Sequence, residues 1–154
     1  MPHIHEKIDF TAETFIVHKN KVLLRMHDKL KVWMSVGGHI ELDEDPVEAA
    51  IREAKEEVGL DVKIIGETMP VGNEIYNYRE IVAPRHLGRH DISSTHEHVV
   101  FVYYAVSETD EVKVSHHDHE KAETQWCSLE DLNTMDLLPN VRFYAKEALE
   151  ELGE

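Results

Sequence analysis

The sequence contains a single cysteine, Cys127, among its 154 residues. One cysteine cannot form an internal disulfide, so a disulfide-built fold is excluded and nothing points to an oxidising compartment. Long apolar runs are also lacking, since the longest, residues 99–106, is far too short to span a bilayer. Residues 1–6 contain no apolar signal core. We therefore expect a cytoplasmic protein without a membrane partner.

Basic residues are scarce. The chain has 16 Lys and Arg against 31 Asp and Glu, for a formal net charge of −15. Such a chain lacks the broad positive field that holds a nucleic acid polymer, so we expect no such partner. It would also repel a free polyphosphate unless metal ions intervened. Apolar residues make up 42% of the sequence, and its length suits one globular domain, which we expect to span residues 1–154.

Histidine, in contrast, is abundant, with 12 residues. Most of them lie at His86, His90, His96 and His98 and in the segment 116–119. A metal-binding or pH-sensing role is one interpretation. The interpretation that we favour is a set of solvent-exposed loop histidines, because no group of them has zinc-finger spacing.

Apolar periodicity predicts alternating strands and helices. Residues 10–17 and 21–25 are apolar and β-branched on either side of a turn, which predicts a β-hairpin. Further strands are predicted over residues 32–36, 62–65, 98–106 and 124–127. Ser128 is expected to cap a short helix, and residues 139–152 to form an amphipathic helix that packs through Phe143, Ala145, Leu149 and Leu152. Residues 69–95 are expected to be irregular, and the whole to be an α/β layered domain.

The clearest helix is predicted over residues 45–58. Asp45 can cap it, Pro46 suits its first turn, Glu48 completes a capping box, and Gly59 ends it. At about 100° per residue, one sector of this helix is apolar and is expected to face the core. This sector holds Val47, Ala50, Ile51, Ala54 and Val58.

Three glutamates, Glu53, Glu56 and Glu57, form a second sector of the same helix. Their i, i+3, i+4 spacing makes them neighbours, so their charges repel one another. A hard divalent cation such as Mg²⁺ removes that repulsion and prefers oxygen ligands. Taken alone, the three glutamates favour the simpler interpretation of a solvated acidic helix face, which is common.

The residues around them narrow this choice. Residues 38–60 match the pattern G-x5-E-x7-R-E-U-x-E-E-x-G-U, where U is apolar. The fixed positions are Gly38, Glu44, Arg52, Glu53, Glu56, Glu57 and Gly59, and Ala54 and Leu60 fill the apolar ones. This segment resembles the Nudix box, so the chain is identified as a member of the Nudix hydrolase family. The resemblance implies an α/β/α sandwich with a mixed β-sheet between helices. Val36 departs from many relatives, which have proline before the paired glycines.

The resemblance also implies a chemistry. Glu53, Glu56 and Glu57, with the Gly38 carbonyl, are expected to bind Mg²⁺ or Mn²⁺. Water then attacks one phosphorus of a diphosphate linkage in a nucleotide. As in the family, Arg52 and Glu44 are expected to pair and brace the loop before the helix. The general base is expected to be Glu53, with Glu97 as the alternative.

The substrate is less well defined by the sequence. Segments 37–41 and 120–126 are similar to a subgroup that hydrolyses nucleoside triphosphates. Tyr76 and Tyr78, 16 and 18 residues past Leu60, are spaced as in relatives that cut dinucleoside polyphosphates. The proline spacing of ADP-ribose hydrolases is not evident. Four aromatic residues are expected to stack a base, or else to pack in the core. They are Trp33, Tyr76, Tyr78 and Trp126.

Three functional classes are considered: a diphosphate hydrolase, a nucleotide-binding sensor, and an acidic metal-binding protein. The intact glutamate set favours the hydrolase. A homodimer is possible, as for many relatives.

Overall fold

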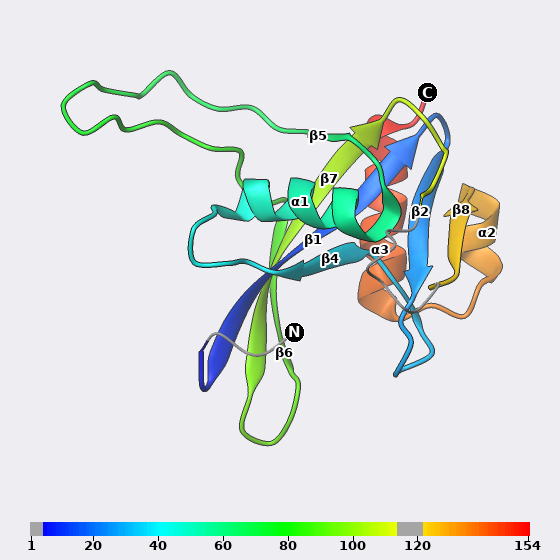
Figure 1. Ribbon diagram of the computed structural model, residues 1–154. Coiled ribbons are helices and arrows are strands. Elements are labelled where there is room, and N and C mark those ends of the chain that lie inside the picture. The colour runs from blue at the N-terminus through cyan, green and yellow to red at the C-terminus, as the bar shows by residue number, and fades with distance from the viewer. Residues whose placement is uncertain (1–4, 114–121) are drawn as a thin grey trace.

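The computed structural model describes residues 5–113 and 122–154; the histidine-containing segment 116–119 and residues 120 and 121 lie outside this part. Two kinds of element alternate along the chain (Figure 1). They are β1 (Ile8–His18), β2 (Lys21–Met26), β3 (Trp33–Met34), β4 (Val36–His39), α1 (Pro46–Val58), β5 (Val62–Ile64), β6 (His86–Asp91), β7 (Glu97–Ser107), β8 (Thr124–Cys127), α2 (Leu129–Thr134) and α3 (Pro139–Leu152). No helix among the described residues is long and apolar enough to cross a membrane.

The centre of the sheet is the long parallel pair of β1 and β7, joined over ten consecutive residue pairs from Ile8↔Glu97 to Val17↔Val106. The other edge of β1 carries two antiparallel neighbours in succession. β4 pairs with residues 11–14 of β1, and β2 pairs with residues 17–18. The sheet therefore forks between β2 and β4, and the fork opens beside the glycines of β4.

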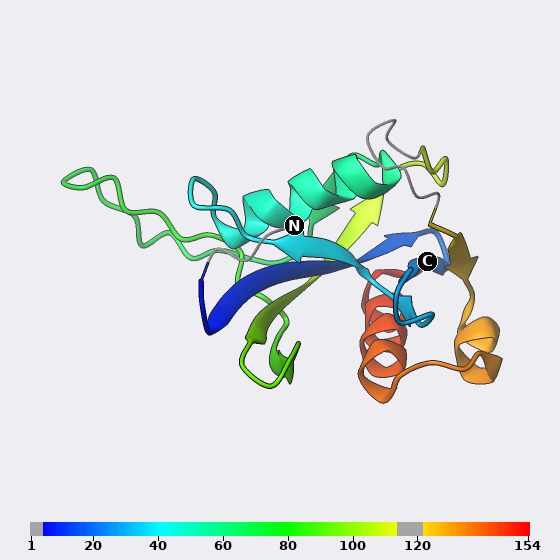
Figure 2. The ribbon, with the colours of Figure 1, turned by 60° about the horizontal axis from the view of Figure 1, so that its bottom comes forward.

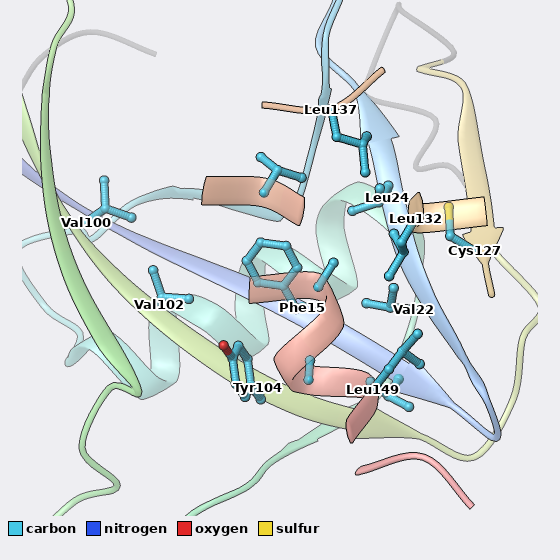
Figure 3. Packing of buried hydrophobic residues seen from close by; sticks show 14 residues of the cluster. Phe15, Val22, Leu24, Val100, Val102, Tyr104, Cys127, Leu132, Leu137 and Leu149 are labelled. Atoms are coloured by element: carbon cyan, nitrogen blue, oxygen red, sulfur yellow. The ribbon is translucent and has the colours of Figure 1, made fainter. Parts of the chain in front are cut away.

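Helices cover both faces of this mixed sheet, with α1 on one face and α3 on the other (Figure 2). Because side chains alternate along β1, Ala12 and Ile16 pack on the α1 face while Phe15 and Val17 pack on the α3 face. Figure 3 shows the α3-side core, where Phe15 and Tyr104 from the sheet meet the helix. The arrangement confirms the predicted α/β/α sandwich.

Helix α1 forms as its local sequence predicts. Asp45 accepts a hydrogen bond from the Glu48 main chain and Glu48 returns one, so the capping box is complete. Gly59 ends the helix at φ 68°, a left-handed conformation that glycine adopts at little cost. The predicted core face is wrong at one position, since Ile51 is 41% exposed. The helix is rotated so that Ala49 and Glu53 are buried in its place.

Three other predictions from the pattern are wrong in part. The predicted strand over residues 32–36 breaks at Ser35, because β3 pairs with β2 and β4 pairs with β1. Within the predicted irregular segment 69–95, β6 pairs antiparallel with β7 through six residue pairs. Its polar sequence, HLGRHD, has little strand character, so the available edge of β7 decides its conformation. On α3, Phe143 is 56% exposed, and Val141 and Ala148 pack in the core instead.

Residues 66–85, which overlap the segment 69–95, leave the body as an extended arm and return to it at Val82 and Arg85 (Figure 1). Its tip is formed by a single antiparallel bridge between Asn73 and Tyr78. Apolar side chains on the arm are largely exposed, including Ile75 at 93% and Tyr76 at 72%.

Candidate active site

The first contact of the site joins β4 to α1. Gly38 pairs with Ala12, whose side chain faces α1, so Gly38 also faces the helix. A Cβ at this position would lie 2.6 Å from Cδ of Glu53. Only glycine leaves room for the carboxyl group in this position. Glu53 as a whole residue is 6% exposed. The Gly38 backbone and the Glu53 carboxylate are therefore held face to face.

Glu57 lies one turn further along the helix, at the fork of the sheet. Its Oε1 accepts a hydrogen bond from the Gly37 main chain at 3.3 Å, and its Oε2 lies 2.9 Å from Nη1 of Arg25. Burial, opposed in part by Arg25, raises the pKa of Glu57 to about 8. Burial likewise raises the pKa of Glu53, which interacts directly with Glu57. The two carboxyl groups therefore lie together in a poorly solvated site, where Arg52 and Arg25 offset only part of the cost of burying their charges.

Arg52 ties the loop before α1 to the helix. Its Nε and Nη2 donate to the two oxygens of Glu44 at 2.9 and 2.6 Å. The Nη2 group also donates to the His39 carbonyl, and Nη1 donates to Glu53 and Glu56 at 3.0 and 3.1 Å. The Arg52 hydrogen bonds hold the pKa of Glu44 below its ordinary value. The predicted Glu44–Arg52 pair is thus present, with a forked geometry that only arginine offers.

The donor set fits a hard divalent cation. Glu53 and Glu57 supply two buried carboxyl groups whose charged forms are disfavoured by burial, which is the situation that a dication relieves. The Gly38 backbone lies against one of them and can add a carbonyl oxygen. Glu56 differs from both because its side chain is 58% exposed and rests on Arg52. It faces the open side of the helix, where a ligand can approach.

A cavity of about 230 Å³ adjoins these groups at the fork. Gly37, Gly38 and Glu57 form one wall, and Leu30 and Met34 form an apolar one. The cavity is further lined by Thr11, Glu13, Arg25, His27, Ser35, His39, His90, Ile92 and His98.

Glu13 was not singled out by the sequence, yet it is a buried carboxyl group in this cavity. Ser35 donates to it at 3.1 Å, and burial raises its pKa. An acidic residue within a strand that is otherwise apolar was the available signal.

Glu97 does not lie with the glutamates of α1 and Gly38. It is the first residue of β7, paired with Ile8, whereas Gly38 lies beside Ala12. The offset of four residues between Ile8 and Ala12 corresponds to about 13 Å along β1. Arg89 donates to Glu97 through Nε at 2.9 Å and lowers the pKa of this carboxyl group.

The four aromatic candidates also lie elsewhere among the described residues. Trp33 packs against the α3-side core, and Trp126 packs on the opposite face while donating to the Asp110 carbonyl at 3.0 Å. Tyr76 and Tyr78 contact each other on the arm, with ring centroids 6.1 Å apart. None of the four lines the cavity, whose apolar surface comes from aliphatic side chains and Met34.

Comparisons with known proteins agree with the motif. The family model described as NUDIX domain matches residues 12–152 of the chain. A hydrolase of the NUDIX family from Clostridium perfringens shares 38% identity with a TM-score of 0.84, covering 94% of this chain and 97% of its own. No curated protein matches the sequence.

More distant structures share the fold. A MutT NUDIX hydrolase from Burkholderia pseudomallei is 24% identical with a TM-score of 0.62, covering 96% of this chain and 99% of its own. An Ap4A hydrolase from C. elegans is 23% identical with a TM-score of 0.59, covering 93% of each chain. At these identities the likeness supports the fold alone.

Proposed function

The chain belongs to the Nudix family and is a pyrophosphohydrolase that acts on nucleoside diphosphate derivatives, and within this class we propose that it hydrolyses nucleoside triphosphates. Water would attack one phosphorus, and the products would be a nucleoside monophosphate and pyrophosphate. The observation that carries this proposal is the buried pair of Glu53 and Glu57 against the glycines of β4, beside a cavity.

Glu53, Glu57, Glu56 and the Gly38 carbonyl would hold Mg²⁺ or Mn²⁺. When bound, such ions neutralise charge that develops on the diphosphate oxygens. The chain's own residues set the geometry for this step. Gly38 has no side chain, so the Glu53 carboxyl group can lie against its backbone. Arg52 keeps the loop and the helix in register through Glu44 and the His39 carbonyl.

We assign the general base to Glu53. Its carboxyl group is buried and faces Gly38, and burial raises its pKa, which makes it a stronger proton acceptor than an exposed carboxylate. Arg52 donates to its Oε1 and so fixes its orientation. Glu97 is a weaker candidate because Arg89 holds it at the end of β7.

The cavity supports a nucleotide as the substrate. Its apolar wall, Leu30 and Met34, offers a surface for a flat base, and Glu57 lines the same cavity. Arg25 lies in this wall and supplies a positive charge that a phosphate can share with Glu57.

The test is a nucleotide panel with Mg²⁺. Nucleoside triphosphates, dinucleoside polyphosphates and ADP-ribose are incubated with the protein, and pyrophosphate and phosphate release are measured separately. We expect pyrophosphate from at least one nucleoside triphosphate, and none from a Glu53→Gln, Glu57→Gln double variant. A preference for dinucleoside polyphosphates or ADP-ribose would overturn the substrate assignment. Tight nucleotide binding without any hydrolysis would make the chain a sensor.

A further inference from the structure

A second cluster of ligating side chains lies beside the glutamate site, on the other face of β4. Asp9, His39 and His98 come from three adjacent strands, and one ligand atom from each lies within 4.8 Å of the others. Asp9 is 1% exposed, and His39 is 12% exposed as a side chain. The expectation of solvent-exposed loop histidines is therefore wrong for this part of the chain.

Strand register explains why these residues meet. Asp9 is paired with His98 across the β1–β7 ladder, and His39 is paired with Thr11, two residues from Asp9 on the same face. All three side chains thus point to the α3 side of the sheet, whereas Gly38 faces α1 and Glu53. The two clusters are neighbours in sequence but are separated by the backbone of β4.

Two further histidines surround the cluster. The ring of His96 lies 5.3 Å from that of His98, and the ring of His90 lies 5.5 Å from it on its other side. His96 is positioned through Nδ1, which lies 3.0 Å from the Glu6 carbonyl, while its Nε2 lies 3.3 Å from Oδ2 of Asp9. If Nδ1 donates to the carbonyl, the lone pair of Nε2 points toward the cluster.

We propose that Asp9, His39 and His98 bind a divalent transition-metal ion of the zinc class, distinct from the ions at the glutamates. Two imidazoles and one carboxylate are the ligands that such ions prefer, whereas Mg²⁺ prefers oxygen ligands alone. His96 packs beside Asp9 and His98 and holds their side chains in place, as partners around metal ligands generally do. The ion would join β4, β1 and β7 at one point.

This ion would also brace the loop between β4 and α1, residues 40–45, which we call the catalytic loop. His39 follows Gly38 directly, and its carbonyl accepts a hydrogen bond from Arg52 at 3.0 Å. Fixing the His39 ring on one side of β4 therefore limits movement of the Gly38 backbone on the other. His39 and His98 both line the cavity that Glu57 lines, so the proposed ion would adjoin the same space.

The competing explanation is a purely protein-made cluster, in which protonated histidines neutralise the buried Asp9. Nε2 of His39 and Nε2 of His96 lie 3.5 and 3.3 Å from its Oδ2, which is compatible with such pairing. The two explanations differ in whether the purified protein binds Zn²⁺ with a defined stoichiometry at these residues. This readout does not depend on hydrolysis.

The experiment is calorimetric titration of the full-length, EDTA-treated and desalted protein with ZnCl₂ in a large excess of Mg²⁺. We expect one tight site in the wild type, retained in the Glu53→Gln, Glu57→Gln double variant. Substitutions His39→Ala and His98→Ala should each weaken it by about 100-fold or more, and His96→Ala by about 10- to 100-fold. A control variant removes the three histidines of the segment 116–119, as His116→Ala, His117→Ala and His119→Ala together, and should leave the site intact.

A second reading comes from Co²⁺, whose visible absorption reports its ligands and should change in the wild type but not in His98→Ala. Circular dichroism in EDTA shows whether each variant folds, and Asp9→Asn, which conserves shape, replaces any that does not. Absence of a tight site in the wild type would overturn the proposal. So would a site that Mg²⁺ displaces, or one that disappears in the triple control and persists in His98→Ala.

Discussion

Replacing Arg52 by alanine tests how the catalytic loop is held. The substitution removes five hydrogen bonds: two to Glu44, one each to Glu53 and Glu56, and one to the His39 carbonyl. The side chains of Arg52 and Glu44 are only 22% and 10% exposed, so water replaces these bonds poorly. Breaking a buried ion pair costs about 3–5 kcal/mol and breaking an exposed one costs about 0–1 kcal/mol. For this intermediate case we expect the free energy of unfolding of the metal-free protein to fall by about 2–4 kcal/mol.

Metal should reduce that loss. Without Arg52, Glu53 and Glu56 face each other with less positive charge nearby, and a bound dication supplies it again. The deficit in free energy of unfolding should therefore shrink by about 1 kcal/mol at saturating Mg²⁺. The lost brace to Glu44 and His39 remains, so turnover should stay lower by about 10- to 100-fold. Arg52→Lys keeps the charge without the fork and should recover stability more than turnover.

The measurements are urea denaturation with EDTA or with Mg²⁺, and turnover at saturating substrate. Lys55→Ala is the matched control, because Lys55 lies on the same helix and forms an exposed ion pair with Asp61 at 3.0 Å. It should change stability by less than about 0.5 kcal/mol. The reasoning is refuted if Arg52→Ala behaves like this control, or if its deficit is the same with and without metal.

Three further predictions concern pH, metal and the arm. Burial raises the pKa of Glu13, so the folded protein keeps a proton that the unfolded chain releases above about pH 4.5. The free energy of unfolding of the wild type should therefore fall as pH rises from there. Glu13→Gln should flatten that slope. Parallel urea-denaturation curves against pH would contradict this. EDTA should abolish turnover; added Mn²⁺ should restore part of it in Glu57→Gln, whereas Glu53→Gln should stay about 10²- to 10⁴-fold slower at saturating metal. Restoration of Glu53→Gln by metal would assign the base elsewhere. Hydrogen exchange in residues 66–85 should be fast without ligand and slower with nucleotide and metal, and equal rates in both states would exclude the arm from binding.

Local sequence alone determines α1 and the spacing of the glutamates that it carries. The cap at Asp45, the end at Gly59 and the spacing of Glu53 and Glu57 depend on residues within one or two turns of each other. The Glu44–Arg52 pair is similarly close in sequence and could be predicted from the motif. The resemblance of this one segment to the Nudix box implies the family, the α/β/α fold and the metal-dependent chemistry. The spacing of the side chains themselves needs little beyond the local sequence, because a helix places them at fixed intervals.

Only the tertiary structure decides what surrounds the helix. β6 forms because β7 offers an edge, and Glu53 is buried because Gly38 of β4 packs against it. Asp9, His39 and His98 are far apart in the chain and meet only through the register of three strands. Register depends on long-range hydrophobic packing rather than on local spacing, so residues that meet across a sheet cannot be paired from one sequence. Long-range packing also places Trp33 and Trp126 away from the cavity, because Trp33 packs against the α3-side core and Trp126 packs on the opposite face of the sheet.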